Sequence, residues 1–337
     1  MGHATRCIPI IKALIKVGFE PILASDGNAL KLLQKEFPFI KYYTLPTYNI
    51  QYSKSSKNLK FKLLLRVPSI LFAVKKEKKI VAQIIKKENI SGLISDNRFG
   101  VYSKEIPSVY ITHQLNVLSG NSTILTSKIH QYIIAKYNEC WVPDTRYEPN
   151  FSGVLGHIEN NLFNLKYLGI LSRLKPYKTK IKYNLLVLLS GPEPQRTALE
   201  NKLLIELKSY NGKILFVRGV LNNSKAIKES INFKVVNYLT TEALEKAFNE
   251  SDLIIARSGY STIMDLAVLG KKAFFIPTQG QFEQEYLAEI LHKKRISPFS
   301  SQQNFTIKSL DKLENYKGFI PSKMNLNLKI FDLFKCE

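Results

Sequence analysis

The sequence predicts an α/β protein built from two doubly wound, parallel β-sheets. Short apolar strands alternate with helical segments of about 10 to 15 residues, which is the pattern of βαβ units. The same alternation begins again after residue 180. Residues 184–191 (NLLVLLSG) form a nearly continuous apolar run, as in a strand buried on both faces of a parallel sheet. We therefore expect two Rossmann-like domains.

Residues 1–160 are predicted to form the first domain. Its expected strands cover residues 20–25, 40–45, 90–96, 108–113 and 139–144. Its expected helices cover residues 5–17, 27–36 and 56–88, and the last of these should break near Pro68, because proline removes a helical hydrogen bond.

Residues 181–323 are predicted to form the second domain. Its expected strands cover residues 184–191, 213–219, 233–239, 252–259 and 272–278, and its expected helices cover residues 194–208, 241–249, 261–269 and 282–292. The charged, breaker-rich stretch LGILSRLKPYKTK places a linker at residues 161–180. A last helix within residues 324–337 is expected to pack back across this seam. Ligands of such sheets bind outside the carboxyl ends of the strands, in the crevice between the two halves.

The composition is that of a soluble globular protein. Of the 337 residues, 45% are hydrophobic and 23% are charged, and no apolar run approaches the roughly 20 residues that span a bilayer. The three cysteines show no metal-ligand spacing, and the N-terminus does not read as a secretory signal. These features predict a reduced, cytoplasmic setting.

The formal net charge of +22 raises the question of an anionic partner. The lysines are dispersed and no arginine-rich motif with interleaved aromatic residues occurs, so we expect no nucleic-acid partner. Residues 54–87 form the densest basic stretch, and apolar groups lie between its lysines. Two readings remain open here: a helix that rests on an anionic membrane surface, on the inner face of the cytoplasmic membrane, or a plain solvated helical face.

The strongest motif is ARSGYSTIMDLAVLGKKAFFIPTQGQFEQEYLA at residues 256–288. A strand runs into a glycine turn, and hydroxyl residues at the start of the next helix are expected to cap it beside N–H groups that bind phosphate. Asp265 lies one turn into that helix, where its carboxylate can accept hydrogen bonds from ribose hydroxyls. The following loop offers Glu283 and Gln284 to sugar hydroxyls.

These residues resemble the C-terminal signature of the GT-B glycosyltransferases related to MurG, glycosyltransferase family 28. The resemblance implies a GT-B fold, two Rossmann-like domains facing across a cleft, with the first N-terminal strand missing here. It also implies a nucleotide-sugar donor, with Asp265 at the ribose and Glu283 and Gln284 at the sugar. The residues expected to face the diphosphate are Ser258, Gly259, Ser261 and Thr262. The other donor-side candidates are Ser190, Gly191, Arg196, Arg218, Arg257 and Gln281.

The N-terminal half carries two weaker resemblances to the same superfamily. Gly2-His3 resembles the end of a GxGH loop, and residues 112–120 (THQLNVLSG) resemble a HEQNxxxG stretch at its histidine, asparagine and glycine. Asp96 ends an expected buried strand, a usual place for a catalytic or acceptor-binding group. The catalytic candidates are therefore His3, Asp96 and His113, and the acceptor-side candidates are Gly2, Asn97 and Asn116.

The resemblance implies an inverting transfer of a hexose or N-acetylhexosamine from a UDP-sugar to an envelope saccharide or a lipid-linked acceptor. The resemblance also implies that no cofactor or bound metal is needed, and the absence of a DxD motif agrees with this. Residues 2–14 (GHATRCIPIIKAL) also resemble the PseG-type UDP-sugar hydrolases, which use water in place of the acceptor. A binding protein without catalysis is the third reading, motivated by Pro192 and Pro194 in the first loop of the second domain. Release of free sugar without an acceptor would separate hydrolysis from transfer.

The opening MGHATRCIPIIKAL reads as the end of a glycine loop followed by its helix, with no strand before the loop. Two explanations fit this pattern. Either the native start lies some residues upstream, which we favour, or the N-terminal sheet lacks its central strand and exposes two edges.

Overall fold

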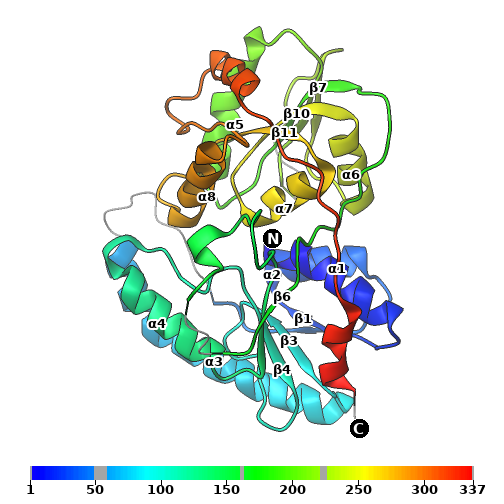
Figure 1. Cartoon of the computed structure of the whole chain (residues 1–337), viewed down its shortest axis with the longest axis vertical. Coiled ribbons are helices and arrows are strands. Elements are labelled where there is room, and N and C mark those ends of the chain that lie inside the picture. Colours follow the sequence, from blue (N-terminus) through cyan, green and yellow to red (C-terminus); the bar gives the residue numbers. More distant parts are fainter. Residues whose placement is uncertain (1, 49–58, 160–162, 221–225, 336–337) are drawn as a thin grey trace. The chain divides into compact units, whose positions relative to one another are not determined.

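The computed structural model describes residues 2–48, 59–159, 163–220 and 226–335 (Figure 1). The chain divides into two compact units, one formed by Met1–Leu171 with Asn325–Glu337 and the other by Ser172–Met324. The sequence analysis placed the boundaries at a linker over 161–180 and at residue 323. That linker is not a free segment, because Leu165–Tyr167 is a strand and Leu168, Ile170 and Leu171 are buried.

The described part of the first unit contains two parallel sheets. Strands β1 (Leu23–Ser25) and β2 (Tyr42–Thr44) form one pair. The second sheet has the order β3-β4-β5-β6, with β3 (Leu93–Asp96), β4 (Ser108–Ile111), β5 (Glu139–Val142) and β6 (Leu165–Tyr167). A single doubly wound sheet was expected. No described strand joins the edge of β1 to that of β3, so the two sheets remain separate.

The described residues of the first unit form four α-helices: α1 (Gly2–Lys16), α2 (Gly27–Glu36), α3 (Leu59–Glu88) and α4 (Thr123–Ile134) (Figure 1). Helix α1 begins earlier than expected, since Gly2 and His3 lie in its first turn and not in a loop. Helix α3 is continuous through Pro68, where a break was expected. Short 3₁₀ turns occur at Gly120–Ser122 and Gly153–Leu155. Within the described ranges, no helix is both long and apolar enough to cross a membrane.

Successive residues of the first unit's central strands face opposite sides of the sheet. On one side, Val109, Ile111 and Trp141 pack against Ile10 of α1 and the 3₁₀ helix η6 (Leu328–Phe334). The other side carries residues of β4 and β5 that pack near the end of α4. The C-terminal segment, expected as an α-helix, is thus a 3₁₀ turn, and its Phe331 ring lies 5.8 Å from that of Trp141.

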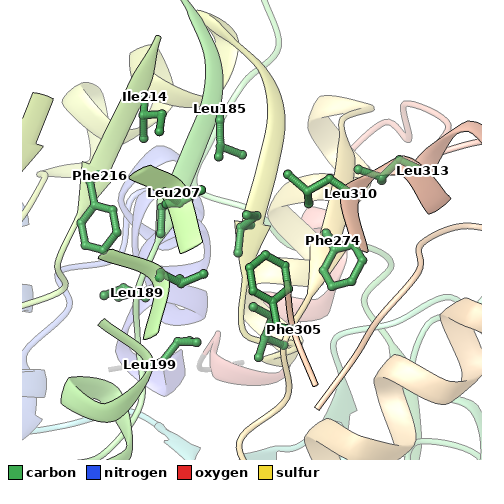
Figure 2. Close-up of a cluster of buried hydrophobic side chains, with 14 residues drawn as sticks. Leu185, Leu189, Leu199, Leu207, Ile214, Phe216, Phe274, Phe305, Leu310 and Leu313 are labelled. Atoms are coloured by element: carbon green, nitrogen blue, oxygen red, sulfur yellow. The ribbon is translucent and has the colours of Figure 1, made fainter. Parts of the chain in front are cut away.

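The second unit has one five-stranded parallel sheet in the order β11-β10-β7-β8-β9. Its strands are β7 (Tyr183–Leu188), β8 (Ile214–Val217), β9 (Phe233–Val236), β10 (Ser251–Ala256) and β11 (Lys272–Phe275). Its helices are α5 (Gln195–Glu206), α6 (Thr241–Asn249), α7 (Tyr260–Leu269), α8 (Phe282–Lys293) and the 3₁₀ segments Leu207–Ser209 and Ile307–Asn315. Figure 2 shows the core where side chains of α5 and of Ile307–Asn315 meet one face of the sheet.

Candidate active site

The sheet of the second unit reverses its winding between β7 and β10. Strand β7 leads through α5 to β8 on one side, and the chain returns through α6 to place β10 on the other side. Because β7 and β10 pair in parallel, with Leu188 opposite Ala256, the turns that follow them lie together at the carboxyl edge. Open α/β sheets bind ligands at such a switch point. Ser190 and Gly191 lie in one of these turns, and residues 257–259 lie in the other.

Arg257 is a buried cation at this edge. Its side chain is 1% exposed, and its guanidinium donates to the carbonyl oxygens of Ile276, Pro277 and Gln195 and to the side-chain oxygen of Gln302. Burial lowers the pKa of Arg257 to about 10, so the group is still charged at neutral pH. Its partners are dipoles and not carboxylates, so its positive charge is available to an anion.

Helix α7 starts directly after this arginine. Its N-cap is Gly259, which has no side chain to satisfy the N–H groups of the first turn. Ser261 and Thr262 were expected to supply the cap. They lie inside the first turn, and the N-cap residue Gly259 forms no side-chain hydrogen bond, so the positive end of the α7 dipole lies at this edge. The Ser258 hydroxyl is engaged, because it donates to the carbonyl oxygen of Gln284.

Several buried polar atoms of this edge have no partner among the described residues: Arg257 Nε, Thr278 Oγ1 and Gln281 Oε1. Buried polar atoms are normally hydrogen-bonded, so such atoms at a ligand edge are ready to contact a ligand. The Thr278 N–H donates to Gln284 Oε1 at 2.8 Å, so the amide oxygen of Gln284 is already used within the protein. Glu283 is half-buried on α8. The sequence analysis missed Thr278, which follows the strand-ending Pro277 and could have been found there.

Arg196 and Arg218, which were expected to bind the donor, are paired with carboxylates. Both guanidinium groups bind the buried carboxylate of Glu200, at 2.7 Å from Arg196 and 2.8 Å from Arg218, and Arg196 also pairs with Glu193. Their charges are compensated inside the protein. A phosphate would have to compete with these carboxylates, and donor binding by either arginine stays a prediction.

Asp265 faces the interior of the second unit. Its side chain is buried, and one carboxylate oxygen accepts a hydrogen bond from the Ser172 hydroxyl. Burial raises the pKa of Asp265 to about 6, against the opposing effects of Arg173 and Ser172. One oxygen that was expected to serve ribose is therefore already used within the protein.

In the first unit, the first turns of α1 meet the carboxyl ends of β3 and β4. His3 Nδ1 lies 3.0 Å from Asp96 Oδ1, and Arg6 Nε donates to Asp96 Oδ2 at 2.7 Å. Arg6 also reaches His113, which follows β4, with Nη1 2.6 Å from Nδ1. The three catalytic candidates are thus brought together around Arg6, a residue the sequence analysis did not single out. Its position three residues after His3, on the same helix face, is the signal that could have found it.

Charge is distributed unevenly in this cluster. Burial alone would raise the pKa of Asp96, but Arg6 and His3 outweigh it and hold that pKa well below its ordinary range. Burial raises the pKa of Cys7, whose thiol lies 3.3 Å from Asp96 Oδ2. Asp96 and Arg6 are almost completely covered, whereas the His3 side chain is 51% exposed. His3 is therefore the member that a substrate can reach.

The three acceptor-side candidates have local structural contacts. The Gly2 carbonyl accepts from the Thr5 hydroxyl. Asn97 adopts a left-handed backbone with φ of 54° and accepts a hydrogen bond from Tyr110. Asn116 donates to the Val154 carbonyl oxygen and so holds the turn at Gly153–Leu155. Asn97 and Asn116 thus shape loops at the strand ends, and an acceptor contact by any of the three remains a prediction.

Comparison with known proteins agrees with this architecture. Residues 193–315 match the glycosyltransferase family 28 C-terminal domain. The chain resembles solved GT-B glycosyltransferases, among them the spinosyn forosaminyltransferase SpnP (TM-score 0.61, 12% identity, 93% of this chain and 87% of that one). Another is Acinetobacter baumannii MurG (TM-score 0.54, 16% identity, 94% of this chain and 89% of that one). The protein is therefore a glycosyltransferase of the GT-B fold.

Similar proteins of known name narrow the class of glycosyltransferase. A transferase from Buchnera aphidicola subsp. Schizaphis graminum is 27% identical over 345 residues, which cover 98% of this chain and 91% of the relative. One from Haemophilus ducreyi is 24% identical over 321 residues, 92% of this chain and 84% of the relative. Both are named UDP-N-acetylglucosamine--N-acetylmuramyl-(pentapeptide) pyrophosphoryl-undecaprenol N-acetylglucosamine transferase. The chain is a MurG-like glycosyltransferase that carries a family 28 C-terminal domain.

Proposed function

We propose that this glycosyltransferase moves a sugar, with inversion, from a UDP-sugar to a lipid-linked saccharide. The names of its relatives supply the chemical class of donor and acceptor. The observation that carries the proposal is Arg257, a buried cation held by carbonyl oxygens beside the uncapped start of α7. Such a site stabilises the negative charge that develops on a departing nucleoside diphosphate.

On the acceptor side, we propose that His3 is the general base. The acceptor hydroxyl attacks the anomeric carbon as the bond to the UDP oxygen breaks, and the hydroxyl proton passes to His3. Asp96 is a poor base, because its pKa is held low, but its carboxylate lies against His3 Nδ1 and stabilises the imidazolium that forms. The reaction proposed here uses no bound metal.

Gly259→Ala tests the donor site. The φ of −74° suits alanine, and an added Cβ meets no atom within 4 Å. The reduced entropy of the unfolded chain offsets the poorer N-cap preference of alanine, so the variant should unfold close to the wild-type temperature. If the diphosphate approaches this backbone, the methyl group takes its place, and UDP-sugar affinity should fall by about tenfold or more. Thermal shift and calorimetry with UDP-N-acetylglucosamine in EDTA measure both effects.

The matched control is Gly219→Ala. Gly219 has φ of 71°, and an added Cβ would lie 2.2 Å from the Leu189 carbonyl oxygen, so this variant should lose stability. Wild-type affinity in Gly259→Ala would refute the donor site. Fast release of free sugar by the wild-type enzyme without an acceptor would favour the hydrolase reading of residues 2–14 instead of transfer.

We further propose that the first unit rests on an anionic membrane surface, with the enzyme peripheral on the cytoplasmic side. On α3, Leu71 and Phe72 are exposed next to Lys75 and Lys76. The exposed apolar residues of α4 are Ile124, Leu125, Ile129 and Tyr132. Lys78 of α3 lies 4.5 Å from the ring centre of Tyr102, and Lys136, two residues after the end of α4, lies 6.0 Å from it. Lys54 and Lys57 of the basic stretch lie outside the described residues.

Phe72→Glu and Leu125→Glu test this surface by sedimentation with vesicles. Removing one apolar side chain from the interface costs about 1.5–3 kcal/mol, so each variant should bind anionic vesicles about tenfold more weakly or worse. Binding should also fall with salt. Ile205→Glu is the control, because Ile205 is similarly exposed on α5 of the other unit. Equal binding of all three variants and the wild type would refute the surface.

A further inference from the structure

Arg6 joins the three groups of the acceptor-side cluster through one guanidinium. Its Nε and Nη2 donate hydrogen bonds to the two carboxylate oxygens of Asp96, with Nε 2.7 Å from Oδ2. Nη1 lies 2.6 Å from His113 Nδ1, and Nη2 lies 2.8 Å from His3 Nδ1. The Arg6 side chain is 4% exposed, so these contacts are made away from solvent.

An arginine can only donate hydrogen bonds, and this decides where the hydrogen of His113 sits. The Nδ1 atom that faces Arg6 must carry a lone pair, so the neutral ring carries its hydrogen on Nε2. A ring in this state can donate a hydrogen bond through Nε2 but cannot accept a proton there. Protonation at Nδ1 would bring two cationic groups within 2.6 Å inside a buried cluster.

His3 stands in a different position. Its Nδ1 faces a donor, Arg6 Nη2, and also an acceptor, Asp96 Oδ1 at 3.0 Å. His3 Nδ1 can therefore carry a lone pair directed at Arg6 or a hydrogen directed at Asp96, and the second arrangement leaves the lone pair on Nε2, on a side chain that is half exposed. Arg6 satisfies the same carboxylate and so holds it in place for this contact. The charged or titratable groups near the two imidazoles include Arg6, Asp96 and the Cys7 thiol, and also His130, which interacts electrostatically with His113.

We infer that Arg6 is a positioning residue that assigns different roles to the two histidines. It locks His113 as a neutral donor through Nε2 and holds Asp96 beside His3, so that of the two imidazoles His3 is the one whose Nδ1–H has a carboxylate acceptor when Nε2 takes the acceptor proton. The catalytic part of this inference rests on the proposed function. The placement of the hydrogen on His113 does not rest on the proposed function, because it follows from the contacts of Arg6 within the first unit.

Nitrogen-15 NMR of histidine-labelled protein tests the placement without any substrate. The chain has five histidines, and His113→Gln assigns the relevant signals. In the wild type at pH 7.5 we expect His113 as the neutral Nε2–H tautomer. In Arg6→Met the signals should move towards a mixture of tautomers. Arg98→Met is the control, because Arg98 is another largely covered arginine, and its partners Glu77, Asp26 and the Pro46 carbonyl oxygen include no histidine. It should leave the His113 signals unchanged.

Kinetics complete the test. Arg6→Met should lower the kcat of sugar transfer by about tenfold or more and leave the KM for the donor unchanged. Arg6→Lys should recover part of the lost kcat, because it restores the positive charge but not the planar set of hydrogen-bond donors of the guanidinium group. A wild-type His113 with its hydrogen on Nδ1 would overturn the inference, as would unchanged spectra and kcat in Arg6→Met. If Arg6→Met does not fold, the wild-type and Arg6→Lys spectra decide. If the histidines show the expected tautomers but the enzyme transfers no sugar from a UDP-sugar, the proposed function is refuted and the role of Arg6 in placing the hydrogens is not.

Discussion

Replacing His3 with alanine should lower the kcat of sugar transfer by about 10²–10⁴-fold, the usual contribution of a general base. The acceptor hydroxyl would then have to lose its proton to water, with no imidazolium held against Asp96. Because the His3 side chain is 51% exposed and lies in the first turn of α1, its removal should change the melting temperature little. Steady-state kinetics at saturating UDP-sugar and acceptor measure the effect.

Two comparisons make the His3 result specific. Lys12→Ala changes an exposed residue of the same helix and should retain wild-type kcat. UDP-sugar affinity of His3→Ala should equal that of the wild type, since the proposed donor contacts belong to the second unit. A kcat within about threefold of the wild type would remove His3 as the base and return the role to an open question between Asp96 and His113.

Glu200→Gln should lower the free energy of unfolding by about 3–5 kcal/mol at neutral pH. The substitution keeps the size of the side chain but leaves the Arg196 and Arg218 guanidinium groups buried without the carboxylate that both contact. Denaturant unfolding of the two proteins measures the difference. Glu289→Gln is the control, because Glu289 forms an exposed ion pair with Lys293 and its loss should cost less than about 1 kcal/mol.

The Glu200 difference should also depend on pH. Burial would raise the pKa of Glu200, but Arg218 and Arg196 outweigh it and lower that pKa below its ordinary value of 4.5. A carboxylate with a lowered folded-state pKa stabilises the protein above its unfolded pKa, and this stabilisation is lost as the pH falls through the folded pKa. The gap between wild type and Glu200→Gln should therefore be full at pH 7 and shrink below about pH 4.5. A gap under 1 kcal/mol at pH 7 would show that the two arginines do not depend on Glu200.

Most of the fold was predictable from local patterns. The alternation of apolar strands and helices, and the unbroken apolar run at 184–191, mark buried parallel strands because burial of both faces leaves no place for polar residues. The glycine turn at Arg257–Gly259 was recognisable because its residues are contiguous. Strand β6, which is only Leu165–Tyr167, was missed, since three residues carry too little periodicity to separate a strand from a linker.

The sequence by itself determined the class of protein and the region of the proposed donor site, because strand periodicity and the 256–288 motif are local features. Only the tertiary structure decided which charged side chains are paired with carboxylates inside the protein and which are not. Arg196, Arg218 and Arg257 look alike in the chain, yet two of them meet Glu200 and one meets only carbonyl oxygens. Likewise, Arg6 acquires its contacts only when residues about 90 and 107 positions away fold against it. Long-range packing sets the electrostatic partners of a side chain, and those partners set its chemistry.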